Sequence, residues 1–301
     1  MKSRNSMPLL WSIIVSTLIL TIITGFARES AYSKYGIQIE KEPLLTVLMQ
    51  GVGDGIMPWN RKDYVVKKDP APITEDKPES TLPTEEVTLP ESVPEKELIP
   101  IFAPVSHDYF DDALFIGDSR TVGLADYSTL DKSTFYAKVS STIYNILDDP
   151  FIEAASDKMS IRQALSQKRY GKIYLMVGIN ELGTGTADTF LDQYRKVVED
   201  IRILQPDSII IIQSIMHVTT EKSLSDKIFN NENINERNEK IKTLADNKKV
   251  FYLDINIPLD DVDGGLNPDL SFDAVHLKAS RYHIWEEYLL QNGVVYTESV
   301  Q

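Results

Sequence analysis

The sequence predicts an α/β fold in which a parallel sheet of about five strands lies between two layers of helices. Three observations support this prediction. Five short apolar runs occur after residue 101, and stretches with helical periodicity lie between them. The runs are apolar at nearly every position, which is typical of strands covered on both faces. Strands that alternate with helices along a chain form parallel sheets.

The five apolar runs and the helical stretches place each element. Strands are expected at residues 113–116, 135–139, 173–177, 209–212 and 250–253, and helices at residues 160–168, 187–204, 232–247 and 279–290. In parallel sheets of this kind, ligands bind beyond the carboxyl ends of the strands. We therefore expect the residues directly after each strand to carry the chemistry.

The first 30 residues predict a membrane anchor. Lys2 and Arg4 precede an uncharged, largely apolar run over residues 5–26, and roughly 20 such residues span a bilayer. Basic residues ahead of a span favour a cytoplasmic N-terminus, so we expect a single-pass protein of the cell membrane whose chain after Arg28 is extracytoplasmic. A cleaved signal peptide is the alternative, although its apolar region normally covers only about 7 to 15 residues. A buried helix of a soluble protein is a further alternative.

Two segments separate the anchor from the predicted catalytic domain at residues 101–301. Residues 31–62 hold scattered apolar side chains and are expected to lie against the bilayer surface or to pack on another element. Residues 63–100 are rich in proline and glutamate, a composition that buries too little apolar surface to fold, so we predict a disordered linker. At roughly 3.1 Å per residue this linker spans on the order of 100 Å.

The composition excludes several functions. The formal net charge of -14 leaves no basic face to neutralise phosphates, so nucleic acid is not an expected partner. The chain has no cysteine, which excludes disulfides, thiolate zinc sites and cysteine nucleophiles. It also lacks a His-Glu-x-x-His pattern, and we expect neither a metal ion nor a cofactor.

Gly117, Asp118, Ser119 and Arg120 directly follow the first predicted strand. Glycine permits a sharp exit from the sheet, which places Ser119 at the amino end of a helix. Unpaired N–H groups and the helix dipole favour developing negative charge at that position. Ser119 is therefore a candidate nucleophile, although serine is also a preferred residue for capping a helix.

Two later motifs supply matching groups. Asn180 follows the third strand, where its amide can donate to a substrate oxygen or to its own turn. Asp273 precedes His276 by three residues, a spacing that lets the carboxylate hold one ring nitrogen while the other faces outward as a general base. Of the 4 histidines, we expect only His276 to have a carboxylate so placed.

These motifs, in the order Ser119, Asn180, Asp273 and His276, resemble those of the SGNH, or GDSL, hydrolase family over roughly residues 108–295. Members of this family are largely esterases with a flavodoxin-like three-layer α/β/α sandwich. The resemblance implies that Ser119 is the nucleophile, His276 its base and Asp273 the orienting carboxylate. It also implies an oxyanion hole made by Ser119, Asn180 and a residue of a second block, where Ser140 stands in place of the usual glycine.

Two residues depart from the family pattern without removing a catalytic atom. Arg120 stands where the family name implies leucine, and Glu181 stands where aspartate is usual. Three motif residues are candidates for contact with substrate: Asp118 and Arg120 beside Ser119, and Gly178 before Asn180. A solvated side chain in the first helical turn is the simpler interpretation of Arg120.

The sequence therefore predicts an extracytoplasmic serine esterase that removes small acyl groups, acetyl first, from a glycan of the cell wall or extracellular space through an acyl-enzyme. Two alternatives use the same fold. An O-acyltransferase would take the acyl group from a membrane-bound acyltransferase partner and pass it to a sugar hydroxyl. A glycan-binding module would have kept the fold and lost catalysis. A true lipase is less consistent with the sequence, because the domain has no long apolar segment to act as a lid.

Overall fold

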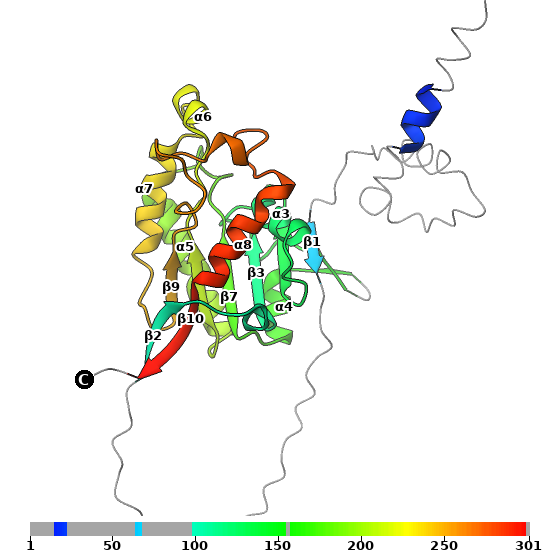
Figure 1. Ribbon diagram of the computed structural model, residues 1–301. Helices are drawn as coiled ribbons and strands as arrows, with labels where there is room; N and C mark the ends of the chain where they lie inside the picture. Colours follow the sequence, from blue (N-terminus) through cyan, green and yellow to red (C-terminus); the bar gives the residue numbers. More distant parts are fainter. Residues whose placement is uncertain (1–14, 23–63, 68–97, 155–156, 299–301) are drawn as a thin grey trace, which may run out of the picture. The chain divides into compact units, whose positions relative to one another are not determined.

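The computed structural model describes residues 15–22, 64–67, 98–154 and 157–298 (Figure 1). The chain divides into two parts after Asp63, and each part is described by itself. In the first part, residues 15–22 form a helix that lies within the predicted anchor. None of the helices in the described ranges is both long and apolar enough to span a bilayer. The rest of the predicted anchor and residues 31–62 lie outside those ranges, so the anchor stays a prediction.

The second part is built on a six-stranded sheet with the order β1-β4-β3-β7-β8-β9 (Figure 1). Five of these strands are parallel, and their order along the sheet is the 2-1-3-4-5 order of flavodoxin-like folds. The prediction of a parallel sheet of about five strands is confirmed. The strands are β1 (Tyr64–Lys67), β3 (Ala113–Gly117), β4 (Thr134–Lys138), β7 (Lys172–Met176), β8 (Ile209–Gln213) and β9 (Val250–Leu253).

Helices cover both faces of the parallel sheet. Successive side chains of a strand point to opposite faces, so each strand contributes to two cores. One core packs beneath α4, α5 and α7, and the other beneath α3 and α8 (Figure 1). The helices are α3 (Ser119–Tyr127), α4 (Ile161–Gln167), α5 (Ala187–Leu204), α6 (Thr220–Ser225), α7 (Asn231–Lys242) and α8 (Tyr282–Gln291).

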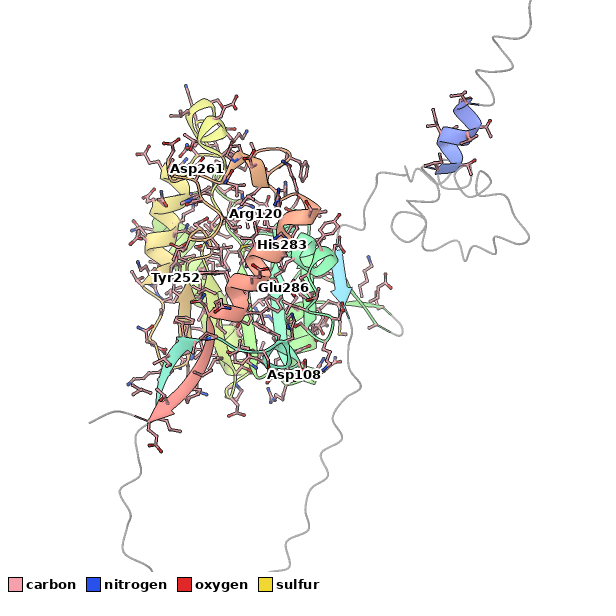
Figure 2. All side chains as sticks on the ribbon, viewed as in Figure 1. Asp108, Arg120, Tyr252, Asp261, His283 and Glu286 are labelled. Atoms are coloured by element: carbon pink, nitrogen blue, oxygen red, sulfur yellow. The ribbon has the colours of Figure 1, made fainter. Side chains whose placement is uncertain are left out.

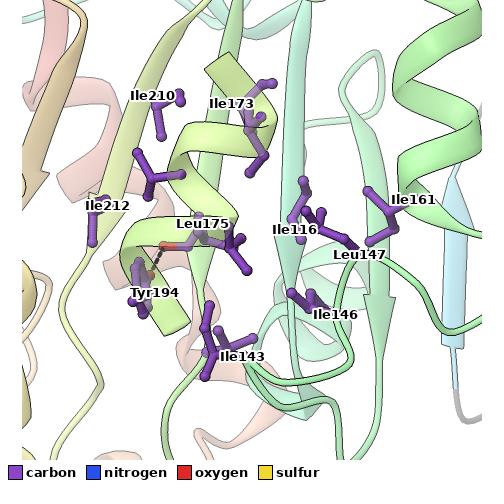
Figure 3. Packing of buried hydrophobic residues seen from close by; sticks show 14 of the residues in the cluster. Ile116, Ile143, Ile146, Leu147, Ile161, Ile173, Leu175, Tyr194, Ile210 and Ile212 are labelled. Carbon is purple, nitrogen blue, oxygen red and sulfur yellow. Dashed lines mark hydrogen bonds between the residues drawn. The ribbon is translucent and has the colours of Figure 1, made fainter. Parts of the chain in front are cut away.

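The core beneath α4, α5 and α7 consists mainly of branched aliphatic side chains. Figure 3 shows Ile116, Leu175 and Ile212 of the sheet together with Tyr194 of α5. The hydroxyl of Tyr194 donates to the carbonyl oxygen of Leu175 at 3.4 Å, so its buried polar atom has a partner. This close packing gives the strands fixed ends, from which the functional loops begin.

The predicted boundaries fail where a side chain competes with a helix for backbone groups. The strands lie within one residue of their predicted ends, and α5 has the predicted limits. In contrast, α7 ends at Lys242, although we predict a helix to residue 247. The carboxylate of Asp246 accepts hydrogen bonds from three successive N–H groups at residues 248–250, and this turn replaces the last part of the helix.

Two strands border most of the predicted linker. β1 pairs antiparallel with β4, where Tyr64 lies opposite Lys138. β2 (Leu98–Ala103) pairs antiparallel with β10 (Gly293–Glu298). Residues 68–97 between these strands lie outside the described ranges. The strands of this part therefore begin at Tyr64, ahead of the predicted domain start at residue 101.

Several short elements complete the domain. These are the two-stranded hairpin of β5 (Ile152–Glu153) and β6 (Lys158–Met159), and the 3-10 helices η2 (His107–Phe110), η3 (Pro268–Leu270) and η4 (Ala279–Arg281). The 3-10 helices η3 and η4 flank residues 271–277, which we call the histidine turn because it contains His276. The N–H group of Thr219, after β8, donates to Ala274 O at 3.0 Å and holds this turn at the carboxyl edge of the sheet.

Candidate active site

Ser119, His276 and Asp273 form a continuous chain of hydrogen bonds at the carboxyl edge of the sheet. Oγ of Ser119 lies 2.9 Å from Nε2 of His276, and Nδ1 of His276 lies 2.7 Å from Oδ2 of Asp273. The side chain of His276 is 31% exposed, so the ring is accessible from solvent. A ring that donates from Nδ1 to the carboxylate leaves Nε2 free to accept a proton from Ser119. This geometry can activate the hydroxyl for attack on an electrophile.

The turn that contains Asp273 keeps its carboxylate charged. Oδ1 of Asp273 accepts hydrogen bonds from the N–H groups of Val275, at 3.0 Å, and His276, at 2.7 Å. Partial burial raises the pKa of Asp273, but these bonds and the His276 ring lower it by more, and the resulting pKa lies below its ordinary value. Ala274 adopts the left-handed region, with φ of 71°, to close the turn. The carboxylate therefore both shapes the turn and orients the ring.

Ser119 is the first residue of α3, and Asp118 is the cap. The carboxylate of Asp118 accepts from the N–H group of Arg120 at 3.0 Å. The interpretation of Ser119 as the cap is wrong, because Asp118 already fills that role and the Ser119 hydroxyl pairs with His276 instead. Asp118 is 1% exposed, and burial raises its pKa although the charge of Arg120 opposes this. Its predicted contact with substrate stays a prediction.

Asn180 lies beside the segment that contains Ser140, as the predicted oxyanion hole requires. Nδ2 of Asn180 donates to Ser141 O at 2.9 Å, which leaves a second amide hydrogen for a ligand. Ser140 has φ of 63°, a left-handed conformation that glycine adopts without strain, and serine therefore takes it at a cost of roughly 1 kcal/mol. The N–H groups of Ser119 and Ser140 donate to no other described residue, so both are available to an anion.

Gly178 allows the chain to turn sharply between β7 and Asn180. It has φ of 145°, and a Cβ atom on it would lie 2.3 Å from Cδ1 of Ile215. No other residue fits this conformation and this space without displacing Ile215. The structure shows a role in the turn for the buried Gly178, and its predicted contact with substrate stays a prediction.

Arg120 is 1% exposed, so the interpretation of its side chain as solvated is wrong (Figure 2). Nη1 donates to Met216 O at 2.8 Å, and Nε donates to Val275 O at 3.3 Å. The physical reason is the position of α3, because this helix starts at the middle of the sheet and its first turn faces neighbouring loops. The predicted contact of Arg120 with substrate also stays a prediction.

Glu181 braces the two halves of the candidate oxyanion hole. One carboxylate oxygen accepts a short hydrogen bond from the N–H group of Ile143, and the other has no partner among the described residues. The side chain is 1% exposed. Burial raises its pKa to about 7, an effect that the Ile143 N–H group opposes and the charge of Asp118 reinforces. A large share of Glu181 is therefore neutral near pH 7.

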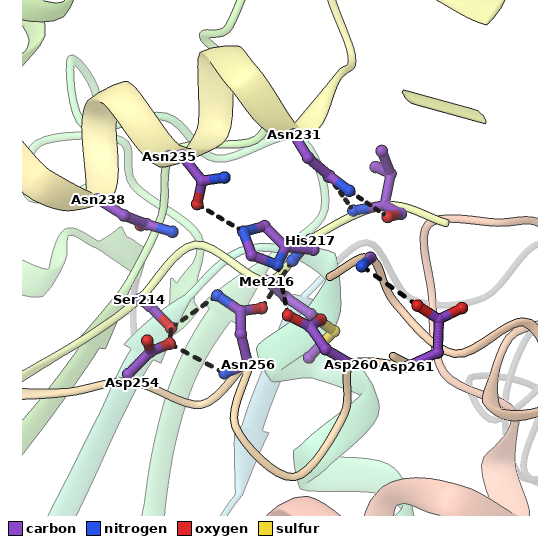
Figure 4. Close-up of polar contacts among 12 residues, drawn as sticks. Ser214, Met216, His217, Asn231, Asn235, Asn238, Asp254, Asn256, Asp260 and Asp261 are labelled. Atoms are coloured by element: carbon purple, nitrogen blue, oxygen red, sulfur yellow. Dashed lines mark hydrogen bonds and ion pairs between the residues drawn. The ribbon is translucent and has the colours of Figure 1, made fainter. Parts of the chain in front are cut away.

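His217, which follows the Arg120 contact Met216 in the loop after β8, also has a carboxylate partner, and the sequence does not predict this pair (Figure 4). Nδ1 of His217 lies 2.7 Å from Oδ2 of Asp260, and Nε2 lies 2.8 Å from Oδ1 of Asn235. Burial lowers the pKa of His217, but Asp260 and Asn235 raise it by more, and the resulting pKa lies above its ordinary value. The ring is buried and has both nitrogens bonded, so it fixes its loop and is not exposed as a base.

Within the described ranges, no group of three or more His, Cys, Asp or Glu side chains is arranged to hold a metal ion. The chain nevertheless resembles known proteins. The model of the GDSL-like lipase/acylhydrolase family matches residues 115–284. Among curated proteins, none matches the chain significantly.

Several solved structures are similar to part of this chain. One, from Streptococcus pneumonia and named as a platelet activating factor, is 21% identical with a TM-score of 0.48, and the match covers 59% of this chain and 81% of that one. An acetylxylan esterase from Geobacillus stearothermophilus is 17% identical with a TM-score of 0.41, covering 59% and 91%. A carbohydrate acetylesterase family member from Sinorhizobium meliloti is 19% identical with a TM-score of 0.41, covering 59% and 94%.

We predict that Glu181→Gln makes the stability of the protein less dependent on pH. The folded pKa of about 7 lies above the unfolded value of 4.5, so the wild-type protein loses stability as the pH rises from about 4.5 through 7. A permanently neutral glutamine avoids this loss, which is at most about 3 kcal/mol. Urea unfolding of both proteins at pH 5, 6, 7 and 8 should show a stability difference that grows in favour of the variant.

The exposed Glu221 on α6 supplies the control for this measurement. Glu221→Gln should give the same small difference from wild type at every pH. A difference between Glu181→Gln and wild type that is constant from pH 5 to 8 would contradict the prediction.

Proposed function

Since this chain belongs to the GDSL-like lipase/acylhydrolase family and is a serine ester hydrolase, we propose that it removes small acyl groups, acetyl first, from a glycan outside the cytoplasm. The observation that carries the proposal is the hydrogen-bonded chain from Ser119 through His276 to Asp273. A glycan-binding module without catalysis has no use for this chain, so that alternative is less consistent with the structure.

In the proposed reaction, Oγ of Ser119 attacks the ester carbonyl while Nε2 of His276 accepts the hydroxyl proton. The charge of Asp273 stabilises the imidazolium that results. The carbonyl oxygen becomes negative and accepts hydrogen bonds from the backbone N–H groups of Ser119 and Ser140 and from the side-chain amide of Asn180. His276 then donates its proton to the departing sugar oxygen, which leaves the acyl group on Ser119. A water molecule, deprotonated by His276, releases the acid and restores the hydroxyl of Ser119.

An exposed aromatic ring beside His276 supports a glycan as the substrate. Phe272 is 69% exposed, and its ring centroid lies 6.1 Å from that of His276 with 19° between the ring planes. The face of an aromatic ring stacks well on the C–H groups of a sugar ring, which removes apolar area from water. A single phenyl ring is too small to bind a long acyl chain, so this feature favours a sugar ester over a lipid.

We propose that the domain lies on the outer side of the cell membrane. The uncharged run over residues 5–26 with Lys2 and Arg4 before it supports a single-pass anchor. Anchored protein should stay with membranes through a carbonate wash, and protease added outside the cell should digest the domain. Recovery of the chain in the soluble fraction would contradict the anchor.

The His276 side chain is 31% exposed, and this access for an acceptor also favours a second candidate function. A sugar hydroxyl could replace water in deacylation, which would make the protein an O-acyltransferase supplied by a membrane-bound acyltransferase partner. Incubation with an acyl donor distinguishes the two functions. Release of free acid at the same rate with and without a glycan acceptor indicates hydrolysis, and acylation of the acceptor at the expense of free acid indicates transfer.

We predict that Ser119→Ala and His276→Ala each lower kcat of the full chain on p-nitrophenyl acetate and on an acetylated oligosaccharide by at least about 1,000-fold. The two residues act as one unit, so the double variant should lose little more than either single variant. Ser225→Ala and His283→Ala, which change exposed residues on α6 and α8, are the controls and should keep wild-type kcat. Substantial activity in either active-site variant would contradict the mechanism.

We predict that Phe272→Ala lowers kcat/KM for an acetylated oligosaccharide by about 5-fold, because a stacking contact contributes roughly 1 kcal/mol. The same variant should keep kcat/KM for ethyl acetate within about 2-fold, since this ester has no ring to stack on Phe272. Leu224→Ala, which removes an exposed apolar side chain from α6, is the control. Equal losses on both esters would mean that Phe272 supports His276 and does not bind sugar.

A further inference from the structure

The side chain of Arg120 joins three segments at the carboxyl edge of the sheet, which we call the catalytic edge because Ser119 and His276 meet there. It starts from the first turn of α3, next to Ser119, and reaches Met216 O after β8 and Val275 O in the histidine turn. Burying a guanidinium is costly unless its donors are bonded. Here two donors reach carbonyl groups, and Nη2 has no partner among the described residues. Burial lowers the pKa of Arg120, and the charges of Asp118 and Asp273 oppose this only in part. Because desolvation of this guanidinium is unfavourable, we expect Arg120 to have a specific role.

The histidine turn is held at three successive carbonyl groups. Ala274 O accepts from the N–H group of Thr219, Val275 O accepts from Nε of Arg120, and His276 O accepts from Oγ of Ser271 at 2.7 Å. Ser271 belongs to the turn itself, and Thr219 belongs to the loop after β8. Of these three donors, only Arg120 comes from the segment that carries the nucleophile.

Arg120 therefore provides a second link between the two segments that meet in catalysis. The hydrogen bond from Ser119 to His276 joins their side chains, and the Arg120 side chain joins the neighbouring positions 120 and 275. A misplacement of about 1 Å between reacting groups can cost on the order of 100-fold in rate. A fixed link between these neighbouring positions limits such a displacement.

The other contact of Arg120 lies on a rigid support. Met216 is fully buried, and the N–H group of His217 donates to Oδ1 of Asn256 at 2.8 Å. The ring of His217 is held between Asp260 and Asn235 on different elements (Figure 4). Arg120 thus transmits the position of a fixed loop to the histidine turn.

We propose that Arg120 is a positioning residue that keeps Nε2 of His276 aligned with Oγ of Ser119 by holding Val275 O and Met216 O at the same time. This inference rests on the proposed esterase mechanism. A planar guanidinium with several donors can hold two carbonyl groups together, whereas a lysine has one nitrogen at a single point.

Gln205 supplies a matched control for the test of Arg120. Its buried amide also donates to two carbonyl groups, Leu165 O at 2.6 Å and Lys168 O at 2.7 Å. These contacts precede β7 and lie at the end of the sheet opposite the catalytic edge. Gln205→Met removes both of these hydrogen bonds, and also those that Oε1 accepts from the N–H group of Tyr170 and from Oγ of Ser208, without touching the histidine turn.

The experiment compares Arg120→Met, Arg120→Lys and Gln205→Met in the full chain, with urea unfolding to identify the folded variants. We expect Arg120→Met to lower kcat on p-nitrophenyl acetate by about 10- to 100-fold, with KM within about 3-fold of wild type. Arg120→Lys keeps the charge but reaches only one carbonyl group, and its kcat should fall by at least about 5-fold. Gln205→Met should lose stability and keep wild-type kcat.

A double-mutant cycle with His276→Ala separates positioning from general loss of structure. If Arg120 acts through His276, Arg120→Met lowers the residual activity of His276→Ala by less than about 2-fold. Losses that multiply in the double variant overturn the proposal, and so does wild-type kcat in Arg120→Met. If Arg120→Met does not fold, Arg120→Lys decides, and wild-type kcat in that variant overturns the proposal.

The rate at which a fluorophosphonate labels Ser119 keeps this test separate from the proposed substrate. A wild-type chain that is labelled but cleaves no acetyl ester contradicts the proposed function, and slower labelling of Arg120→Met then still supports the positioning role. Equal labelling of Arg120→Met and wild type overturns that role. A wild-type chain that is not labelled overturns both.

Discussion

The hydrogen bond between Ser119 and His276 is the interaction on which the rest of the structure depends. Its two residues are 157 positions apart in the chain, and only the topology of the sheet brings them together. Parallel strands deliver their carboxyl ends to one edge, so α3 and the loop after β8 begin there. The histidine turn then docks on that loop. The helix layers and both cores keep this edge in place.

Ionisable groups are buried around this bond. Asp118, Arg120, Glu181 and His217 are each at most 7% exposed. Asp118 caps its own helix, and the other three each form a hydrogen bond with a neighbouring segment. Buried ionic groups contribute little net stability, and removing one partner is costly. Their directional hydrogen bonds hold the irregular loops around the site in a single arrangement. The site is therefore held together by interactions that are more valuable for geometry than for stability.

The sequence predicted what depends on neighbouring residues. Strand positions, the limits of α5 and the Asp-x-x-His turn all follow from patterns within a few positions. The burial of Arg120 was not predictable, because its acceptors lie 96 and 155 positions away. The pairing of His217 with Asp260 was not predictable for the same reason, since 43 positions separate the two residues. Local patterns locate the reacting groups, and only the folded chain shows which side chains hold them in place.

The pairing of β1 with β4 determines where the chain arriving from its N-terminal part joins the sheet. Tyr64 lies opposite Lys138, two positions before Ser140, so this junction is at the catalytic edge. Residues 68–97 then connect two strands of one domain. Their length therefore separates β1 from β2 along the chain and adds nothing to the distance that the chain before Tyr64 can span.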